Sequence, residues 1–197
     1  RASNGFGGSA AMVDELLPAM RSAPFAGHAG NDGSAIAWGR ALGARLADLG
    51  GCQGHGSWAV PQGVLISWAL MTEGGIQVNA EGRRFHDETG GYSEASVQVL
   101  AQPGGVAWNV FDDRLLALGR TFPDFVLAES AGAVRSADDV AALALHIGWT
   151  PPGKRELCSW SCRTSSGLGN GMRCGSTRDG VAADGRSQAT CSPVTGS

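Results

Sequence analysis

The stretch that most constrains the fold runs from residue 74 to 88 and reads GGIQVNAEGRRFHDE. Ile76 and Val78 alternate with a glutamine, which is the spacing of a strand with one apolar face. An Asn-Ala-Glu-Gly turn follows, in which Gly82 can adopt a positive φ without steric cost. The chain then returns through Arg84. The pattern predicts a tight β-hairpin.

The return limb of this hairpin concentrates charge, because it reads RRFHDE. A short, stiff support of this kind can hold a guanidinium near a bound anion. The same residues can also form a solvated surface ion pair, which contributes little to stability. The residues by themselves leave both interpretations open.

Charge and hydropathy narrow the range of partners. The 197 residues carry a formal net charge of −3, which argues against nucleic acid as a main partner. No apolar run approaches the length of a membrane span. The length allows one or two domains. The chain begins at Arg1 without a signal peptide, so we expect a cytoplasmic protein that is a fragment or a processed product.

The five cysteines do not predict a metal centre. Cys158 and Cys162 lie close together, but long gaps separate them from Cys174 and Cys191. Zinc sites of the knuckle type prefer two pairs of closely spaced ligands. No secretory signal supports a disulfide framework either. We therefore expect no metal.

Hydrophobic periodicity predicts a mixture of helices and strands. Helices are predicted over residues 10–20, 34–47 and 92–101, and strands over 63–68 and 105–112. Asp112 and Asp113 are predicted to open a further helix, where acidic side chains are favoured.

The residues after 120 predict shorter elements. Residues 121–126 are predicted to form a loop that leads into a short strand. Ser136 is predicted to cap a short helix with acids in its first turn. The side chains predicted to pack this helix are Val140, Leu143, Leu145 and Ile147.

The last segment, residues 151–197, differs in composition from the rest. It contains few large aliphatic or phenyl side chains, carries a positive excess and has no helical or strand period. Such a segment cannot bury enough apolar area to offset its ordering entropy. We expect an irregular, disordered tail, which a reading-frame change or a truncated reading frame would explain.

The motif GIQVNAEGRRFHDE resembles the GGI-x-VN-x-x-G-x-RF-x-x-E segment of the FAD-dependent fumarate reductase and succinate dehydrogenase flavoprotein family. The run QPGGVAWNVFD at residues 102–112 is similar to a motif of its tricarballylate dehydrogenase-like branch. The resemblance covers residues 4–150 and implies FAD as the cofactor. It also implies an α+β or α/β fold, namely the substrate-capping domain of a flavoprotein with an edge of its FAD-binding domain.

Two glycine-marked loops are implied to contact FAD. The run SNGFGGSA fits a dinucleotide G-x-G-x-x-G/A fingerprint only superficially, because no strand precedes it. It resembles the family's ATGGFG turn, which implies close approach to the flavin at Gly5 and Gly7. The run NDG resembles the family's TGDG loop, which implies FAD contacts at Asp32 and Gly33. The alternative for Asp32 is a helix cap.

The resemblance also implies two substrate-binding residues. QGH lies where the family shows Q-x-HPT, which implies that His55 binds a substrate carboxylate, and an imidazole beside a carboxylate is reasonable anion chemistry. Arg84 matches the arginine that donates a proton to the substrate in fumarate reductases, and an arginine can also grip a carboxylate. The acidic Glu88 is expected to be an ion-pair partner of Arg83 or Arg84.

One departure from the family bears on the substrate. Trp68 and Met71 occupy the positions of a Glu and an Arg that relay protons in fumarate reductases. Neither side chain can relay a proton, so the departure counts against fumarate and favours a bulkier or more apolar ligand.

These observations give one domain scheme and three functional hypotheses. Residues 1–48 are expected to be the edge of the FAD-binding domain, 49–150 the capping domain and 151–197 the tail. The resemblance implies hydride transfer between the flavin and a carbon–carbon bond of a dicarboxylate-like or related small molecule, with a possible electron-transfer partner. The alternative is a catalytically inactive truncated or frameshifted fragment. A hydrolase built on His55 and Ser57 lacks the G-x-S-x-G elbow.

Overall fold

The computed structural model describes residues 5–138, 140–146, 148 and 189–195. The α-helices are α1 (Ala10–Leu16), α2 (Ser34–Ala41), α3 (Ala69–Thr72), α4 (Tyr92–Leu100), α5 (Asp113–Gly119), α6 (Pro123–Ser130) and α7 (Val140–His146). Short 3₁₀ helices are η1 (Pro18–Met20), η2 (Glu88–Gly90) and η3 (Pro103–Gly105). No described helix has the length and apolar character needed to cross a membrane.

The strands form one sheet, in which neighbouring strands are often not consecutive in the sequence. They are β1 (Trp58–Ala59), β2 (Val64–Leu65), β3 (Ile76–Asn79), β4 (Val106–Asp112), β5 (Arg135–Ala137) and β6 (Ala189–Thr195). The order across the sheet is β2-β1-β6-β4-β3, and β5 also pairs with β6. All these pairings are antiparallel. The mixed α and β fold that the sequence predicts is therefore present.

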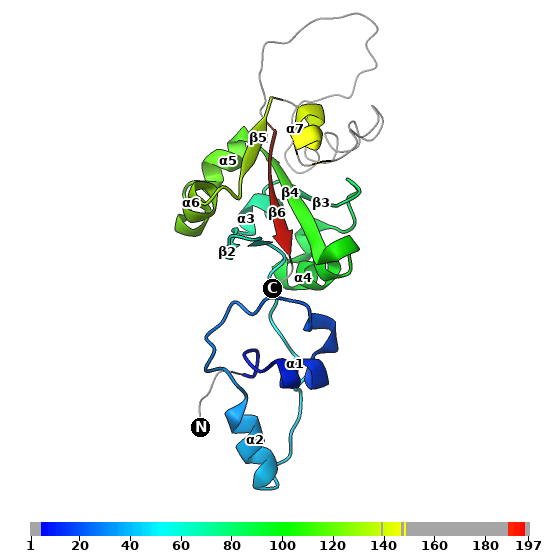
Figure 1. The fold of residues 1–197 in the computed structure, drawn as a ribbon, viewed down its shortest axis with the longest axis vertical. Coiled ribbons are helices and arrows are strands. Elements are labelled where there is room, and N and C mark those ends of the chain that lie inside the picture. The colour runs from blue at the N-terminus through cyan, green and yellow to red at the C-terminus, as the bar shows by residue number, and fades with distance from the viewer. Residues whose placement is uncertain (1–4, 139, 147, 149–188, 196–197) are drawn as a thin grey trace, which may run out of the picture.

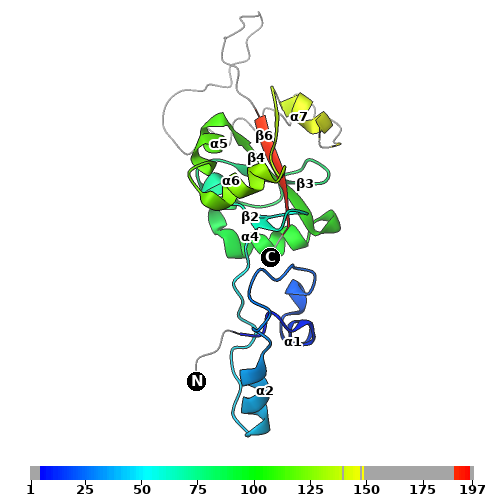
Figure 2. The ribbon, with the colours of Figure 1, turned by 60° about the vertical axis from the view of Figure 1, so that its left-hand side comes forward.

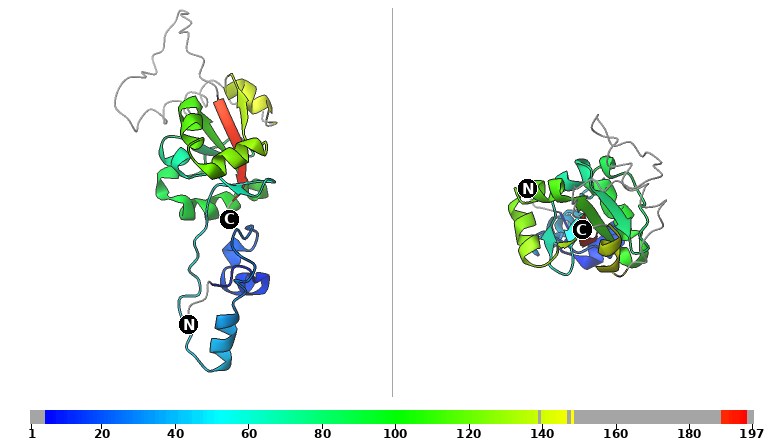
Figure 3. Two further views of the ribbon diagram at one scale, coloured as in Figure 1. Left: turned by 90° about the vertical axis from the view of Figure 1, so that its left-hand side faces the viewer. Right: turned by 90° about the horizontal axis from the view of Figure 1, so that it is seen from above.

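The molecule is elongated, with a small N-terminal part and a larger part built on the sheet (Figure 1). The N-terminal part holds α1 and α2. The segment after α2 runs back along this part to reach the sheet, as Figure 3 shows from the side. The two parts are thus connected through the residues that lead into β1.

Both faces of the sheet are covered by helices. Ala107 and Phe111 of β4 face a large core shared with α3, α4, α5 and α6. Val110, with Trp108 packed beside it, belongs to a second core with α7 on the other face. Figure 2 shows α5 and α7 on opposite sides of the sheet. Because successive strand residues alternate between faces, Asn109 lies on the side of the large core.

The predicted hairpin is present, but both faces of its first strand, β3, are buried. The Gly82 N–H donates to the Asn79 carbonyl over 2.9 Å, and Gly82 has a φ of 73°. The return limb pairs with β3 only through an isolated bridge between Val78 and Arg84. The strand that pairs with β3 along its whole length is β4. The sequence pattern predicts one apolar face, with Gln77 on the other. Gln77 is fully buried, because that other face packs against protein too.

The central elements of the chain follow their predicted positions. The structure confirms the predicted helix at 92–101 as α4, the strand at 105–112 as β4, and the helix that follows Asp112 as α5. The Asp112 carboxylate accepts a 2.9 Å hydrogen bond from the Leu115 N–H, so its role is the expected helix cap.

Three predicted elements are shorter than expected. The helix α1 stops before Pro18, which cannot continue it and starts η1 instead. The helix α2 ends at Ala41, two residues before Gly43 adopts a φ of 74°. The strand predicted over 63–68 shrinks to the two residues of β2, because the chain turns into α3 at residue 69.

Predictions for residues 121–146 fail at three points. The supposed loop and strand at 121–126 begins α6, with Pro123 at the first helical position, where its missing N–H does no harm. Ser136, predicted to be a helix cap, lies in β5. Leu145 is 67% exposed, whereas Leu143 is buried as predicted. The side chain of Val140 and the whole of Ile147 lie outside the described residues.

The expectation of an irregular tail is wrong for residues 189–195, which form β6. This strand pairs with all of β4 and with both β1 and β5. The partners that stabilise β6 lie far away in the sequence, so the composition of residues 189–195 by itself does not indicate a strand. The rest of the tail, with Cys158, Cys162 and Cys174, lies outside the described residues. Of the cysteines, Cys52 is free and exposed.

Phe125 is the largest fully buried side chain among the described residues, and it lies in the large core. It is fully buried, and its ring lies 6.0 Å from that of Phe111 in an edge-to-face arrangement. Gly119 of α5 passes so close that a Cβ there would meet the Phe125 ring at 2.9 Å. This contact brings α5 and α6 together and against the sheet.

We expect Phe125→Ala to lower the free energy of unfolding by about 3–5 kcal/mol, because it removes a buried ring and leaves a cavity. The neighbouring Val126 is 47% exposed, and Val126→Ala should cost less than about 1 kcal/mol. Urea denaturation of the two variants measures the difference. Equal losses would contradict the placement of α6 in the core.

Candidate functional site

A buried glutamine amide lies at the centre of the candidate site. The Nε2 of Gln77 donates to the Gly56 carbonyl over 2.7 Å and to Asn109 Oδ1 over 2.8 Å. Its Oε1 lies 2.8 Å from His86 Nε2. Asn109 Nδ2 then donates to Ser57 Oγ over 3.0 Å. These bonds connect β3, β4, the loop before β1 and the return limb of the hairpin.

The network fixes the orientation of the amide and the tautomer of the histidine. The Gly56 carbonyl can only accept, so the nitrogen of the Gln77 amide faces it and the oxygen faces His86. His86 must therefore carry a hydrogen on Nε2. Burial lowers the pKa of His86, against an opposing effect of the Glu88 carboxylate. His86 is accordingly a neutral donor to Gln77 at neutral pH.

The arginine of the hairpin is held by a buried carboxylate. Glu88 is 2% exposed and accepts hydrogen bonds from Arg84 Nε, with its two oxygens at 3.0 and 2.9 Å. Arg84 Nη2 also donates to Glu88, and the Gln77 N–H donates to Glu88 Oε1 over 2.8 Å. Arg83 instead pairs with Glu81 at the surface. The expected ion pair of Glu88 thus forms with Arg84.

His55 is fixed by aromatic packing. Its ring stacks on Tyr92 with centroids 5.0 Å apart and meets Trp68 edge-on at 6.2 Å. Its Nδ1 accepts from the main-chain N–H of Ser57 over 3.2 Å. Burial lowers the pKa of His55 to about 4, so the imidazole is neutral at pH 7. A neutral imidazole would bind a carboxylate through a hydrogen bond, without a charge of its own.

Two further details concern the aromatic side. Ser57 is fully buried, and its hydroxyl is engaged with Asn109, which gives the hydrolase hypothesis no support. Trp68 lies between the two imidazoles, with its ring 6.4 Å from that of His86. Its indole N–H is buried and has no hydrogen-bond partner among the residues that the structure describes. An unpaired buried donor costs about 1–3 kcal/mol.

The predicted cofactor loops divide into two groups. Gly5 and Gly7 line an open groove of about 590 Å³ in the N-terminal part, together with Phe6, Phe25 and the segment 51–53. Asn31 also lines this groove, but the groove lining does not include Asp32 or Gly33. The structure therefore places two of the four predicted residues at the groove.

Asp32 and Gly33 have clear structural tasks. Asp32 Oδ1 accepts from the Ser34 N–H over 2.9 Å, and the hydrogen bonds from Ser34 lower the pKa of its carboxyl. Asp32 thus holds the first residue of α2, but the N-cap position is Gly33, so the alternative that Asp32 is the N-cap is wrong. Gly33 has a φ of 78°, and a Cβ there would lie 2.2 Å from Met12 Sδ. A side chain at 33 would therefore displace α1.

The groove fits one part of FAD and leaves another unaccounted for. Its volume lies within the roughly 300–1,000 Å³ of small-molecule sites. A Cβ at Gly5 would meet nothing within 4 Å, so a ligand can approach the main chain there. Phe6 and Phe25 offer apolar contact to a flat ring. A strand–G-x-G-x-x-G–helix unit for a pyrophosphate does not occur among the described residues.

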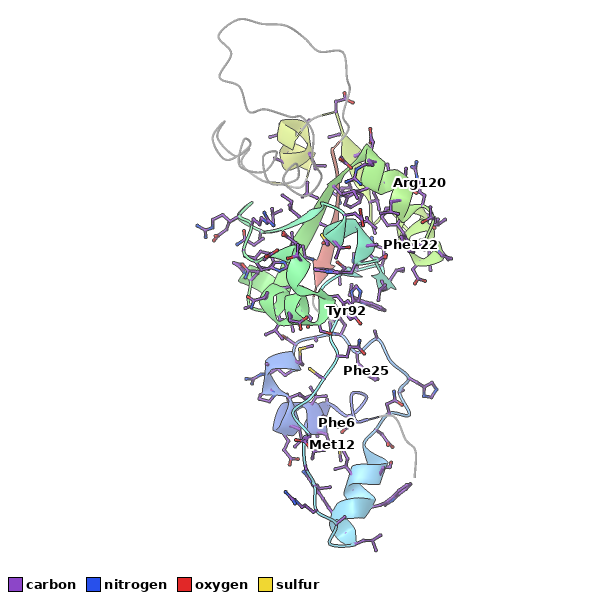
Figure 4. The ribbon with its side chains drawn as sticks, turned by 180° about the vertical axis from the view of Figure 1, so that it is seen from behind. Phe6, Met12, Phe25, Tyr92, Arg120 and Phe122 are labelled. Atoms are coloured by element: carbon purple, nitrogen blue, oxygen red, sulfur yellow. The ribbon has the colours of Figure 1, made fainter. Side chains whose placement is uncertain are left out.

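A short chain of contacts joins this groove to the buried network. Gln53, in the groove lining, donates from Nε2 to the Tyr92 hydroxyl over 2.6 Å. Tyr92 stacks on His55. Gly56, which follows His55 in the chain, supplies the carbonyl that accepts from Gln77. Figure 4 shows Tyr92 at the end of the sheet part that faces Phe25. The groove and the network are thus neighbouring features.

His55 and Arg84 are connected indirectly, through Gln77 and its contacts with Gly56 and Glu88. The residues that connect them, namely Gln77, Asn109 and His86, are not recognised in the sequence. The available signal was an amide in the middle of each of two apolar strands, IQVN and VAWNVFD. Such residues must pair with each other when both strands are buried.

Comparison with known proteins gives a consistent assignment. The family model described as FAD binding domain matches residues 1–146. The NADH:fumarate oxidoreductase of Klebsiella pneumoniae (strain 342) is 31% identical over 147 residues, which are 75% of this chain and 16% of that protein. A fumarate reductase (cytochrome) of Shewanella frigidimarina is 32% identical over 112 residues, 57% of this chain and 20% of that protein. The chain spans about a fifth or less of these relatives.

Solved structures show a similar fold. The open conformation of a flavocytochrome c3 fumarate reductase superposes with a TM-score of 0.70 at 22% identity, over 98% of this chain and 33% of the other. A 3-ketosteroid-delta4-(5alpha)-dehydrogenase from Rhodococcus jostii RHA1 has a TM-score of 0.50 at 20% identity, over 79% and 30%. The family model indicates FAD as the cofactor, and the curated relatives show that the chain is fumarate reductase-like.

The lowered pKa of His55 predicts a dependence of stability on pH. Between pH 6.5 and about 4 the unfolded chain takes up a proton at His55 that the folded chain refuses, so acid removes stability over this window. We expect the free energy of unfolding of His55→Gln to fall less steeply from pH 7 to pH 5 than that of the unmodified chain. Urea denaturation at several pH values measures this slope.

The matched control for this measurement is His28→Gln, at an exposed loop position. It should keep the steeper slope. A His55→Gln slope indistinguishable from that of the control would contradict the burial of the His55 ring.

Proposed function

Because the chain belongs to the family of FAD binding domains, we propose that it is part of an FAD-dependent oxidoreductase. The reaction is hydride transfer between the flavin and a carbon–carbon bond of a dicarboxylate-like or related small molecule. The observation that carries this proposal is the buried network, which holds His55 and Arg84 on one scaffold. Since the chain spans about a fifth or less of its curated relatives, the activity is proposed for the whole protein.

Arg84 has the geometry to bind an anion while remaining fixed. Glu88 accepts hydrogen bonds from Nε and Nη2 of Arg84, so the guanidinium is anchored along one edge. The side chain is 25% exposed, and its other edge, with Nη1, can present N–H groups to a substrate carboxylate. We assign Arg84 to grip the carboxylate and to hold a proton near the carbon that receives it. FAD, when bound, supplies the hydride chemistry.

His55 would contribute a hydrogen bond to a substrate oxygen. Because burial keeps it neutral at pH 7, it would bind that oxygen without a charge of its own. Trp68 and Met71 are both buried and apolar in character, so they offer no proton path toward Arg84. These features favour a substrate with a larger apolar part than fumarate has.

The finer assignments are part of the same proposal. Residues 1–48 would belong to the FAD-binding domain, with Gly5 and Gly7 beside the cofactor, and residues 49–150 to a capping domain. The groove supports the first assignment. The motif at 102–112 supports the tricarballylate dehydrogenase-like branch. The name of the cytochrome-type relative supports an electron-transfer partner.

The first test concerns the cofactor. We expect the full-length protein to retain FAD through gel filtration and the 197-residue chain to lose it, because the described residues offer a groove without a pyrophosphate-binding unit. Gly5→Leu, which fills the open side of the groove, should weaken the residual FAD binding seen by calorimetry. Absence of flavin binding in the full-length protein would contradict the proposal and support the alternative of a catalytically inactive protein.

The second test compares the two hairpin arginines in the full-length flavoprotein. Arg84→Lys should lower turnover by about 10²–10⁴-fold, because lysine keeps the charge but loses the fork that Glu88 holds. Arg83→Lys removes a surface contact and should change turnover by less than about fivefold. Steady-state rates are measured with fumarate and with the bulkier cinnamate, using a reduced viologen as electron donor.

Flavin content is checked in both arginine variants, so that loss of cofactor is not mistaken for loss of turnover. Equal and small effects of the two substitutions would reject Arg84 as a catalytic residue.

A further inference from the structure

We propose that Gln77 is a positioning residue that places both candidate substrate-binding side chains by two separable means. Its side chain holds the loop that carries His55, and its main chain holds the carboxylate that fixes Arg84. The roles of His55 and Arg84 toward a substrate rest on the proposed function. The mechanical role of Gln77 rests on contacts within the described residues.

The first means is the main chain. The Gln77 N–H donates to Glu88 Oε1 over 2.8 Å. The same carboxylate accepts hydrogen bonds from Nε and Nη2 of Arg84. Every residue except proline has this N–H, so the bond survives a change of side chain at position 77. The anchoring of Arg84 therefore depends on the backbone of β3 and on Glu88.

The second means is the side-chain amide. Gln77 Nε2 binds the carbonyl of Gly56, the residue that follows His55. On its other side this loop is pressed against α4, since a Cβ at Gly56 would lie 2.7 Å from Ala95 Cβ. The Gly56 N–H also donates to the Tyr92 carbonyl over 2.9 Å. The amide and α4 together hold the loop in one position.

The position of Gln77 itself is fixed by the sheet. It pairs in register with Asn109 of β4, and both side chains are fully buried. The Oε1 of Gln77 accepts a hydrogen bond from Nε2 of His86. This bond attaches the return limb of the hairpin to β3 at a second point. Replacement of the amide by an apolar side chain would leave the Gly56 carbonyl and the His86 N–H without this partner, which is costly for buried groups.

The test is hydrogen exchange and nitrogen-15 NMR on the 197-residue chain. In Gln77→Met the amide of Gly56 should exchange about ten- to a hundredfold faster, while the Nε–H of Arg84 keeps its protection. In Glu88→Gln the Arg84 Nε–H should exchange at least about tenfold faster, while the Gly56 amide does not change. Gln98→Met, at an exposed glutamine of α4, is the control and should leave both signals as they are.

Two outcomes would overturn the proposal. One is unchanged exchange of the Gly56 amide in Gln77→Met. The other is equal acceleration at Gly56 and at Arg84 in that variant, which would mean that the two limbs open as one unit. If Gln77→Met does not fold, Gln77→Ser decides the matter, because it removes the amide donor to the Gly56 carbonyl and leaves room for water at the freed polar groups. It should accelerate exchange at Gly56 and spare Arg84, and the absence of this effect would overturn the proposal.

A kinetic measurement on the full-length flavoprotein distinguishes positioning from the proposed function. With the probe that is turned over, fumarate or cinnamate, Gln77→Met should raise KM and Glu88→Gln should lower kcat, because the first displaces His55 and the second frees Arg84. The same change of KM and kcat in both variants would overturn the separate placement of the two residues. The predicted exchange pattern without turnover of either probe would uphold the positioning and contradict the proposed function.

Discussion

A fully buried glutamine amide is the interaction on which the candidate site depends. An amide moved out of water is costly unless its donors and acceptor are satisfied, and each polar group of the Gln77 side chain has a partner within 2.8 Å. The partners belong to separate segments: a loop, a central strand and the return limb of a hairpin. Satisfying one amide therefore requires all three segments to be in place at once. A network of this kind specifies one arrangement more strictly than apolar packing does.

The sheet makes this arrangement possible because both of its faces are buried. On one face, Ile76, Val78 and Val110 pack with α7, and on the other, Ala107 and Phe111 pack with the larger core. The register of β3 and β4 sets Gln77 opposite Asn109. Gln77 donates to Asn109 across the ladder, and Asn109 donates onward to Ser57, so the polar groups of the pair are satisfied inside the larger core.

Local sequence predicts the parts of this protein that local physics decides. The turn at Gly82, the cap at Asp112 and the helix α4 follow from the conformational freedom of glycine, side-chain capping and helical period. The failures concern long-range structure. Pro123 suits a turn or a first helical turn equally well, and burial of Phe125 against the sheet selects the helix. The strand β6 has its partners far away in the chain, and no period within it signals them.

The site follows the same division. Motif resemblance singles out His55 and Arg84, whose substrate-binding roles stay predictions. Asp32 and Gly33 have structural explanations, namely a hydrogen bond to the first residue of α2 and a close approach to Met12. The linking residue Gln77 escapes detection because a glutamine between Ile76 and Val78 has the pattern of a solvent-facing residue. Gln77 is predicted to be buried only if both faces of the sheet are known to be covered. The alternating pattern indicates which residues share a face and says nothing about what covers it.

The protonation state of the site results from the same packing that gives it shape. The stacking on Tyr92 and the edge contact with Trp68 hold the His55 ring, and by excluding water they also lower its pKa to about 4. His86 is held by Gln77 and likewise loses its cationic form to burial. The charge of Arg84, in contrast, lies against a buried carboxylate. Geometry and charge are therefore not independent here, since a substitution that admits water to either ring also raises the pKa of that imidazole toward its ordinary value.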